Sequence, residues 1–209
     1  ARLSVMYQRQ DDWVDNVNPS APKKDALEGY KELAARLQVM IKPSDDLSLL
    51  RAANAPKRGL GTSALGTLSE FSRSHSTSLL EAFAKAPEIP DLSPKAASSA
   101  VALSGLISRY REMFTKGRDM GKTLKALIEE ISYNNHITEL YKTPETAFRK
   151  IENLDGFVES LNRYELAEST ERAPSLHGFL EAMALTDLLE SKEEKSSKTE
   201  NKHGRTVHT

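Results

Sequence analysis

Apolar residues recur at helical spacing through most of this chain, and this pattern constrains the fold more than any other feature of the sequence. In the first such segment the apolar positions are Leu27, Tyr30, Leu33, Ala34, Leu37 and Ile41. This spacing places the side chains on one face of a helix, which can then pack against a core. Because signals for strands are nearly absent, the sequence predicts an all-α fold.

Prolines and capping residues divide the pattern into successive helices. Pro43 ends the first helix, and Ser44 is expected to cap a short second helix that Pro56 ends. Thr62 is expected to cap the next helix, and Ser76 or Thr77 the one after it. Later helices are expected to begin at Ser93-Pro94, with Ser93 as the cap, at Thr143-Pro144 and at Pro174-Ser175. Gly117 and Gly121 are expected to flank a break between two helices.

Composition along the chain predicts three segments. Residues 1–22 are expected to form a short extended arm, because apolar and polar residues alternate near its start. Residues 23–189 are expected to form the helical domain, with a sub-boundary in the proline-bearing connection near residues 87–94. Residues 190–209 are charged and serine-rich without an apolar face, which is typical of a flexible linker.

Composition also excludes several kinds of chemistry. The 209 residues include no cysteine, which rules out disulfides, thiolate catalysis and thiolate-bound zinc. No apolar run is long enough to cross a bilayer, and no signal-peptide pattern opens the chain, so a cytoplasmic protein without a membrane partner is expected. The chain begins with Ala1 rather than Met, as we expect of a domain from a longer protein.

No catalytic constellation is recognisable in the sequence. A phosphate loop of the form Gly-x-x-x-x-Gly-Lys-Ser/Thr is missing, so the chain alone is not expected to hydrolyse ATP. None of the histidines pairs with another at the spacing of helical metal ligands; these are His75, His136, His177, His203 and His208. We therefore expect no catalytic residue, no metal and no cofactor in this chain.

The segment from Pro56 to Thr62 is the candidate binding site. Its two glycines allow the backbone to turn tightly and to approach a neighbour closely. The helix that follows leaves backbone N–H groups unpaired at its start, where an anion can bind, and Lys57 and Arg58 add positive charge. This combination suits a nucleic-acid phosphate held by a turn like that of a helix-hairpin-helix. The alternative is that Gly-Leu-Gly forms only a tight turn.

Residues Tyr30 to Thr62 resemble the 2B subdomain of UvrD/Rep/PcrA-type superfamily-1 DNA helicases. The family has an Asn-Pro-x-Asp-Asp-x-x-x-Leu-Arg segment followed by Asn-x-Pro-x-Arg-Gly-Ile-Gly and a helix. The matching residues here are Lys42-Pro43-Ser44-Asp45-Asp46 with Leu50-Arg51, and Asn54-Ala55-Pro56-Lys57-Arg58-Gly59-Leu60-Gly61. The closing Thr206-Val207-His208-Thr209 is similar to the start of the family's Thr-x-His-x-x-Lys-Gly motif. The family's Gly-Gly-x-x-Phe-Phe stretch is replaced by Ala21-Pro22-Lys23-Lys24-Asp25.

The resemblance implies a duplex-DNA-binding and regulatory subdomain of an ATP-dependent helicase that acts in DNA repair or replication. It implies that this subdomain swivels between open and closed states, and that the motor domains, with their ATP and Mg²⁺, lie outside this chain. The implied partners are the duplex DNA backbone, the motor domains and a regulatory protein. The residues that would hold a duplex phosphate are Lys57, Arg58, Gly59, Leu60, Gly61 and Thr62.

A second hypothesis is a helical protein–protein interaction module without direct DNA contact. Binding that is insensitive to salt, through an apolar surface, would favour this hypothesis. Because the net charge of the chain is only −1, any DNA contact is expected to be local. A stand-alone enzyme is the least supported alternative, since the sequence offers no catalytic constellation.

Overall fold

The computed structural model describes residues 24–54, 56–167 and 173–185. The chain divides into two compact units, of which the larger is formed by residues 22–177. Residues 178–185 belong to the second unit and are helical. The predicted arm at residues 1–22 and the predicted linker at residues 190–209 lie outside the described residues. The candidate site at residues 56–62 lies in the larger unit.

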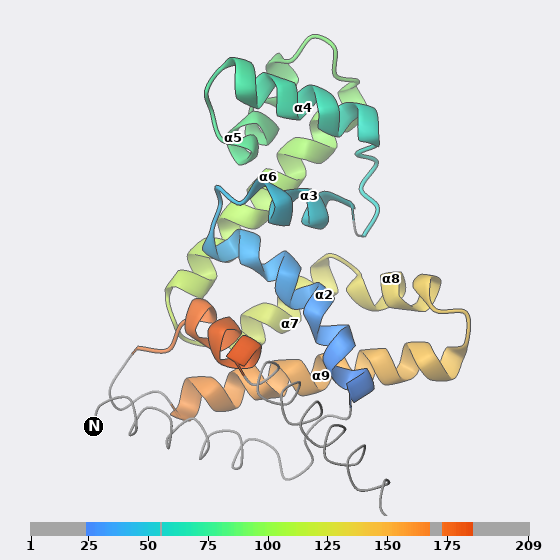
Figure 1. The fold of residues 1–209 in the computed structure, drawn as a ribbon, viewed down its shortest axis with the longest axis vertical. Coiled ribbons are helices and arrows are strands. Elements are labelled where there is room, and N and C mark those ends of the chain that lie inside the picture. Colours follow the sequence, from blue (N-terminus) through green and yellow to red (C-terminus); the bar gives the residue numbers. More distant parts are fainter. Residues whose placement is uncertain (1–23, 55, 168–172, 186–209) are drawn as a thin grey trace, which may run out of the picture. The chain divides into compact units, whose positions relative to one another are not determined.

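The larger unit consists of helices and their connections, in the part of the chain that the structure describes (Figure 1). The predicted all-α class is therefore confirmed. In chain order the elements are α2 (Lys24–Ile41), α3 (Asp46–Asn54), α4 (Thr62–Ser74), α5 (Leu79–Ala84), the 3-10 helix η1 (Ala86–Glu88), α6 (Pro94–Thr115), α7 (Met120–Glu130), α8 (Tyr133–Leu140) and α9 (Pro144–Ala167). A further helical stretch begins at Leu176.

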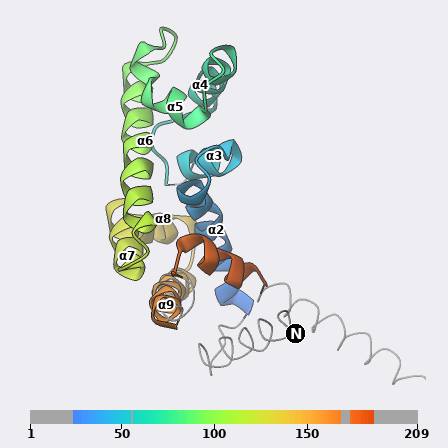
Figure 2. The ribbon, with the colours of Figure 1, turned by 90° about the vertical axis from the view of Figure 1, so that its left-hand side faces the viewer.

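Helix α6 is the element that joins the two ends of this unit (Figure 2). Helix α5 and η1 pack against α6, and α4 packs on α5 near the same end. Helices α2 and α7 also pack against α6, and α9 packs against α2, α7 and α8. Large side chains that are fully buried along this arrangement include Phe83, Leu103, Ile107, Leu124 and Phe157. The sub-boundary near residues 87–94 stays a prediction.

Two predicted helix starts can be compared directly with side-chain caps. Ser93 caps α6 as predicted, because its Oγ accepts a hydrogen bond from the N–H of Ala96 at 3.3 Å. The prediction of Ser44 as the cap of α3 is wrong. Asp45 has that role, since its Oδ1 accepts from the N–H of Ser48 at 3.2 Å. Hydrogen bonds from Ser48 also hold the pKa of Asp45 below its usual value.

The predicted cap of α5 is also displaced along the chain. Ser78, rather than Ser76 or Thr77, caps this helix, and its Oγ accepts from the N–H of Glu81 at 3.2 Å. Ser76 instead lies in the left-handed region, with a φ of 52°, and turns the chain after α4. Several neighbouring hydroxyl residues can cap a helix equally well, so the backbone turn decides which of them does so.

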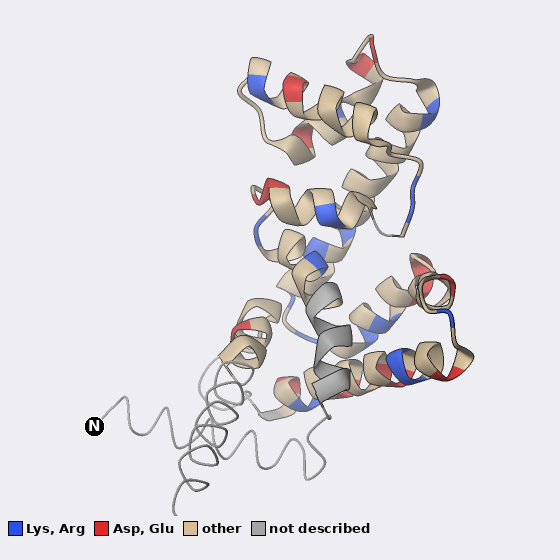
Figure 3. Cartoon of the chain, turned by 45° about the vertical axis from the view of Figure 1, so that its right-hand side comes forward, with Lys and Arg blue, Asp and Glu red and all other residues tan. Residues whose placement is uncertain are grey.

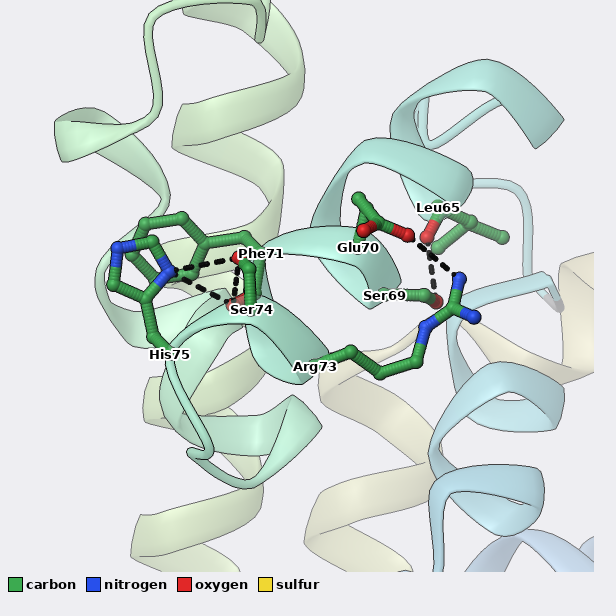
Figure 4. Close-up of polar contacts among 7 residues, drawn as sticks. All are labelled: Leu65, Ser69, Glu70, Phe71, Arg73, Ser74 and His75. Atoms are coloured by element: carbon green, nitrogen blue, oxygen red, sulfur yellow. Dashed lines mark hydrogen bonds and ion pairs between the residues drawn. The ribbon is translucent and has the colours of Figure 1, made fainter.

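His75 completes the end of α4 (Figure 4). Its ring stacks on that of Phe71 with the centroids 4.0 Å apart, and its Nδ1 lies 3.0 Å from the Phe71 carbonyl oxygen. The Ser74 hydroxyl donates to the same carbonyl at 3.1 Å. On the other side of the helix in the same view, Arg73 and Glu70 form an exposed ion pair at 2.9 Å. These contacts give His75 a structural role at a helix end, where unpaired carbonyl groups need donors.

Glu165 of α9 caps the start of α7 from outside that helix. Its carboxylate accepts hydrogen bonds from the N–H groups of Asp119 and Met120, the latter at 2.9 Å. Asp119 has a φ of 53°, and its own side chain makes no cap hydrogen bond. The cap therefore depends on the packing of α9 against α7.

Glu165→Ala is expected to destabilise the larger unit by about 1–2 kcal/mol, because two backbone donors lose their acceptor. Thermal unfolding measures this loss. Glu159→Ala, on the same helix, is the matched control, since Glu159 forms an exposed ion pair with Arg163 at 3.5 Å. That control is expected to change stability by less than about 0.5 kcal/mol. Equal losses in the two variants would contradict the cap.

Candidate nucleic-acid interface

The turn between α3 and α4 carries a short basic segment, drawn blue in Figure 3. Lys57 and Gly59 are exposed, and so are Gly61 and Thr62. Leu60 points the other way and is only 7% exposed, so it fixes the turn to the core. Of the predicted site residues, Leu60 could therefore contribute only backbone groups to a ligand.

Gly59 has a backbone conformation that side chains rarely adopt. Its φ is +77°, in the left-handed region where glycine carries no steric penalty. A Cβ at this position would lie 3.6 Å from Lys95 Cε and 3.8 Å from Ser99 Oγ. The turn thus lies against the first turns of α6, and a substitution at Gly59 would strain the backbone before it tested any binding role.

Helix α4 begins without a side-chain cap. The prediction that Thr62 caps it is wrong: Gly61 is the N-cap residue, with φ −77° and ψ 170°, and Thr62 is the first residue of the helix. Among the described residues, no acceptor receives the N–H groups of Thr62, Ser63 or Ala64. The helix start therefore keeps its unpaired donors and its partial positive charge available.

Space in front of this helix start is open as well. A Cβ built on Gly61 would have no atom within 4 Å. By contrast, side-chain oxygens of Asp45, Ser78, Ser93 and Glu165 cap α3, α5, α6 and α7. The α4 start can thus accept an anion where those four helices are already satisfied.

Arg58 lies differently from Lys57. Its side chain is half-buried, and its Nε is buried without a hydrogen-bond partner among the described residues. Burial lowers the pKa of the Arg58 guanidinium, and the Glu130 carboxylate acts in the opposite direction. Arg58 therefore supports the turn from behind more than it faces solvent.

The carboxylate that interacts with Arg58 is itself held in place. Glu130, at the end of α7, accepts hydrogen bonds from the Tyr110 hydroxyl at 2.7 Å and from the Arg109 guanidinium. The Tyr110 bond is the largest cause that holds the pKa of Glu130 below its usual value, with Arg109 and Arg58 acting in the same direction. Burial and this hydrogen bond raise the pKa of Tyr110 to about 12. Sequence reasoning missed this cluster, because nothing in the sequence links α6 and α7 to the turn.

The arrangement is suited to binding an anion. A phosphate oxygen can accept hydrogen bonds from three N–H groups beside an exposed lysine, and there is open space for it. A buried leucine holds the turn in place. In the ranges that the structure describes, no group of three or more histidine, aspartate or glutamate side chains could hold a metal ion. Likewise, none of the described helices is long and apolar enough to cross a membrane.

Residues 28–209 match the model of the UvrD-like helicase C-terminal domain. The chain belongs to this family. Among relatives of this UvrD-like chain, the ATP-dependent DNA helicase PcrA of Bacillus subtilis (strain 168) is 27% identical over 170 residues. That alignment covers 79% of the chain and 22% of the relative. The predicted resemblance is therefore confirmed at the level of the family.

Two further relatives of the UvrD-like chain give the same result. The ATP-dependent DNA helicase UvrD1 of Mycobacterium leprae (strain TN) is 26% identical over 152 residues, which cover 70% of the chain and 19% of the relative. The ATP-dependent DNA helicase Rep of Salmonella typhimurium (strain LT2) is 24% identical over 163 residues, which cover 77% of the chain and 23% of the relative. The chain thus spans about a fifth of the length of these helicases.

Proposed function

We propose that this chain is the 2B-type subdomain of a larger ATP-dependent helicase, and that it binds the backbone of duplex DNA through residues 56–62. Membership of the UvrD-like family and relatives that are named DNA helicases support this proposal. ATP, Mg²⁺ and the motor would belong to parts of the parent helicase outside this chain. Within the parent, the subdomain would regulate unwinding by swivelling between open and closed states.

The observation that carries the proposal is the uncapped start of α4 beside an exposed lysine. Phosphate oxygens could accept from the N–H groups of Thr62, Ser63 and Ala64, and Gly61 leaves room for them. Lys57 would add a charge-assisted contact. Contacts of this kind position a protein on a duplex and read no sequence, as a helicase subdomain requires.

Arg58 has an indirect place in this proposal. Because the side chain is half-buried and interacts with Glu130, we assign it to holding the turn and to adding positive potential behind it. Lys57, Gly61 and Thr62 would make the direct contacts from the solvent side. Leu60 would fix the turn from the core side.

Lys57→Gln is expected to weaken duplex binding and to reduce its salt dependence. The slope of the logarithm of the association constant K against log salt is negative, and it should become less steep by about 0.9, because one phosphate contact is lost. Fluorescence anisotropy of a labelled hairpin duplex, titrated with the 209-residue chain at several salt concentrations, measures both quantities. Lys125→Gln, at an exposed lysine of α7, is the control and should leave both unchanged. An unchanged slope in Lys57→Gln would argue against the proposed contact.

A protein-interaction module is the second candidate function, and two exposed apolar side chains favour it. Leu140 at the end of α8 is 52% exposed, and Phe148 in α9 is 62% exposed. Aromatic side chains such as that of Phe148 are enriched where a protein partner binds. If Phe148→Ser weakened association with a protein partner while duplex binding stayed undetectable at low salt, this second function would replace the first.

A further inference from the structure

Lys95 lies against the turn although it is far from it in the sequence. It is the second residue of α6, and its Cε would lie 3.6 Å from a Cβ placed on Gly59. One turn further along α6, Ser99 Oγ would lie 3.8 Å from the same point. The end of the Lys95 stem therefore lies beside the glycine of the turn, which has no side chain to displace it.

The charge of Lys95 is not neutralised within the described structure. Lys95 is exposed, as is Lys57, and neither lysine forms an ion pair or a hydrogen bond with any described residue. Other exposed lysines of this unit do pair, such as Lys85 with Glu81 at 2.8 Å and Lys122 with Asp119 at 2.7 Å. Lys57, two residues before Gly59, and Lys95, across from it, thus both lack a carboxylate partner among the described residues.

A structural role for Lys95 requires only its stem. The methylene groups can cover the backbone at Gly59 while the ammonium stays in water. An ammonium carries three donors, and a phosphate group is a ligand that it binds readily as a point charge. The positions of Lys95 and Ser99 beside an exposed basic turn favour this second use.

We propose that Lys95, with Ser99 beside it, contacts a second phosphate of the duplex held by the turn. The binding surface would then comprise residues 57–62 and the first turns of α6. This inference rests on the proposed function and extends it to residues outside the segment that resembles the family motif.

Lys95→Gln in the 209-residue chain tests the inference, with a labelled hairpin duplex as the probe. The slope of log K against log salt should become less steep by about 0.9 in Lys95→Gln. In the double variant Lys57→Gln/Lys95→Gln it should become less steep by about 1.8. Arg111→Gln is the matched control, because this exposed residue lies about 24 Å further along the same helix. Lys95→Arg should retain the wild-type slope, since the charge is kept.

The outcomes separate the inference from the proposed function. If Lys57→Gln makes the slope less steep while Lys95→Gln matches the wild type, the second contact is wrong and the duplex-binding turn stands. If the wild-type chain does not bind the duplex at low salt, both proposals fail. A slope less steep by about 0.9 in Lys95→Gln and unchanged in Arg111→Gln supports both. The midpoints of thermal unfolding of Lys95→Gln and Arg111→Gln should equal that of the wild type, which would show that both variants retain the fold.

Discussion

Gly121→Ala is expected to stabilise the larger unit less than alanine normally stabilises a helix over glycine, because the new methyl group must displace the side chain of Asn162. A Cβ at this position would lie only 2.5 Å from Asn162 Cγ. Asn162 can make room by rotating its side chain, so this cost should offset part of the gain of up to about 1 kcal/mol that alanine gives in a helix. The midpoint of thermal unfolding should shift by about 2–4 °C for each kcal/mol gained or lost.

Gly105→Ala, in α6, is the matched control for this prediction. No atom lies within 4 Å of a Cβ at Gly105, so alanine should raise stability by about 0.5–1 kcal/mol. Asn162→Ala in the Gly121→Ala background should recover the missing part of the gain, since it removes the group that has to move. If Gly121→Ala were as stabilising as Gly105→Ala, the close packing of α7 against α9 would be wrong.

Gly61→Ser is expected to separate binding from stability at the α4 start. Serine is a preferred N-cap residue, and the backbone at Gly61 is already extended, so stability should rise by a few tenths of a kcal/mol. The new hydroxyl oxygen would accept from the N–H of Ser63 or Ala64 and would occupy the open space. A phosphate would lose charge-assisted hydrogen bonds of about 1.5–3 kcal/mol, so duplex affinity should fall at least about tenfold.

A matched control makes this experiment specific. Gly66→Ser, at an exposed position of α4 with no atom within 4 Å, should leave duplex affinity unchanged. Gly59 is not a useful position, because a φ of +77° strains any side chain placed there. Equal affinities for the wild type and Gly61→Ser, with thermal unfolding showing a folded variant, would contradict the role of the α4 start.

The helices themselves could be predicted because their apolar spacing is a local property of the sequence. Leu33 and Leu37 lie on the predicted apolar face of α2, and both are buried. Helix starts were less predictable where several capping residues lie together, as at Ser76, Thr77 and Ser78. There the backbone turn, and not the residue type, selects the cap.

The turn was recognisable from its glycines and cations, but the roles of its residues depend on tertiary packing. Lys57 and Arg58 are neighbours in the sequence, yet one is exposed and the other is half-buried toward Glu130. Lys95 was not predicted because it meets the turn only through the packing of α6. The charges in the sequence therefore predict a basic site at the turn, and burial in the structure distinguishes the exposed Lys57 from the supporting Arg58.

The most direct measurement is the affinity of the wild-type chain and of Gly61→Ser for a labelled hairpin duplex at several salt concentrations. Fluorescence anisotropy of the duplex is the readout. The proposed function predicts that wild-type binding weakens steeply with salt, and that Gly61→Ser binds at least about tenfold more weakly at every salt concentration. Its thermal midpoint should be equal to or above that of the wild type. Binding curves that coincide, or wild-type binding that does not respond to salt, would contradict a duplex phosphate held at the start of α4.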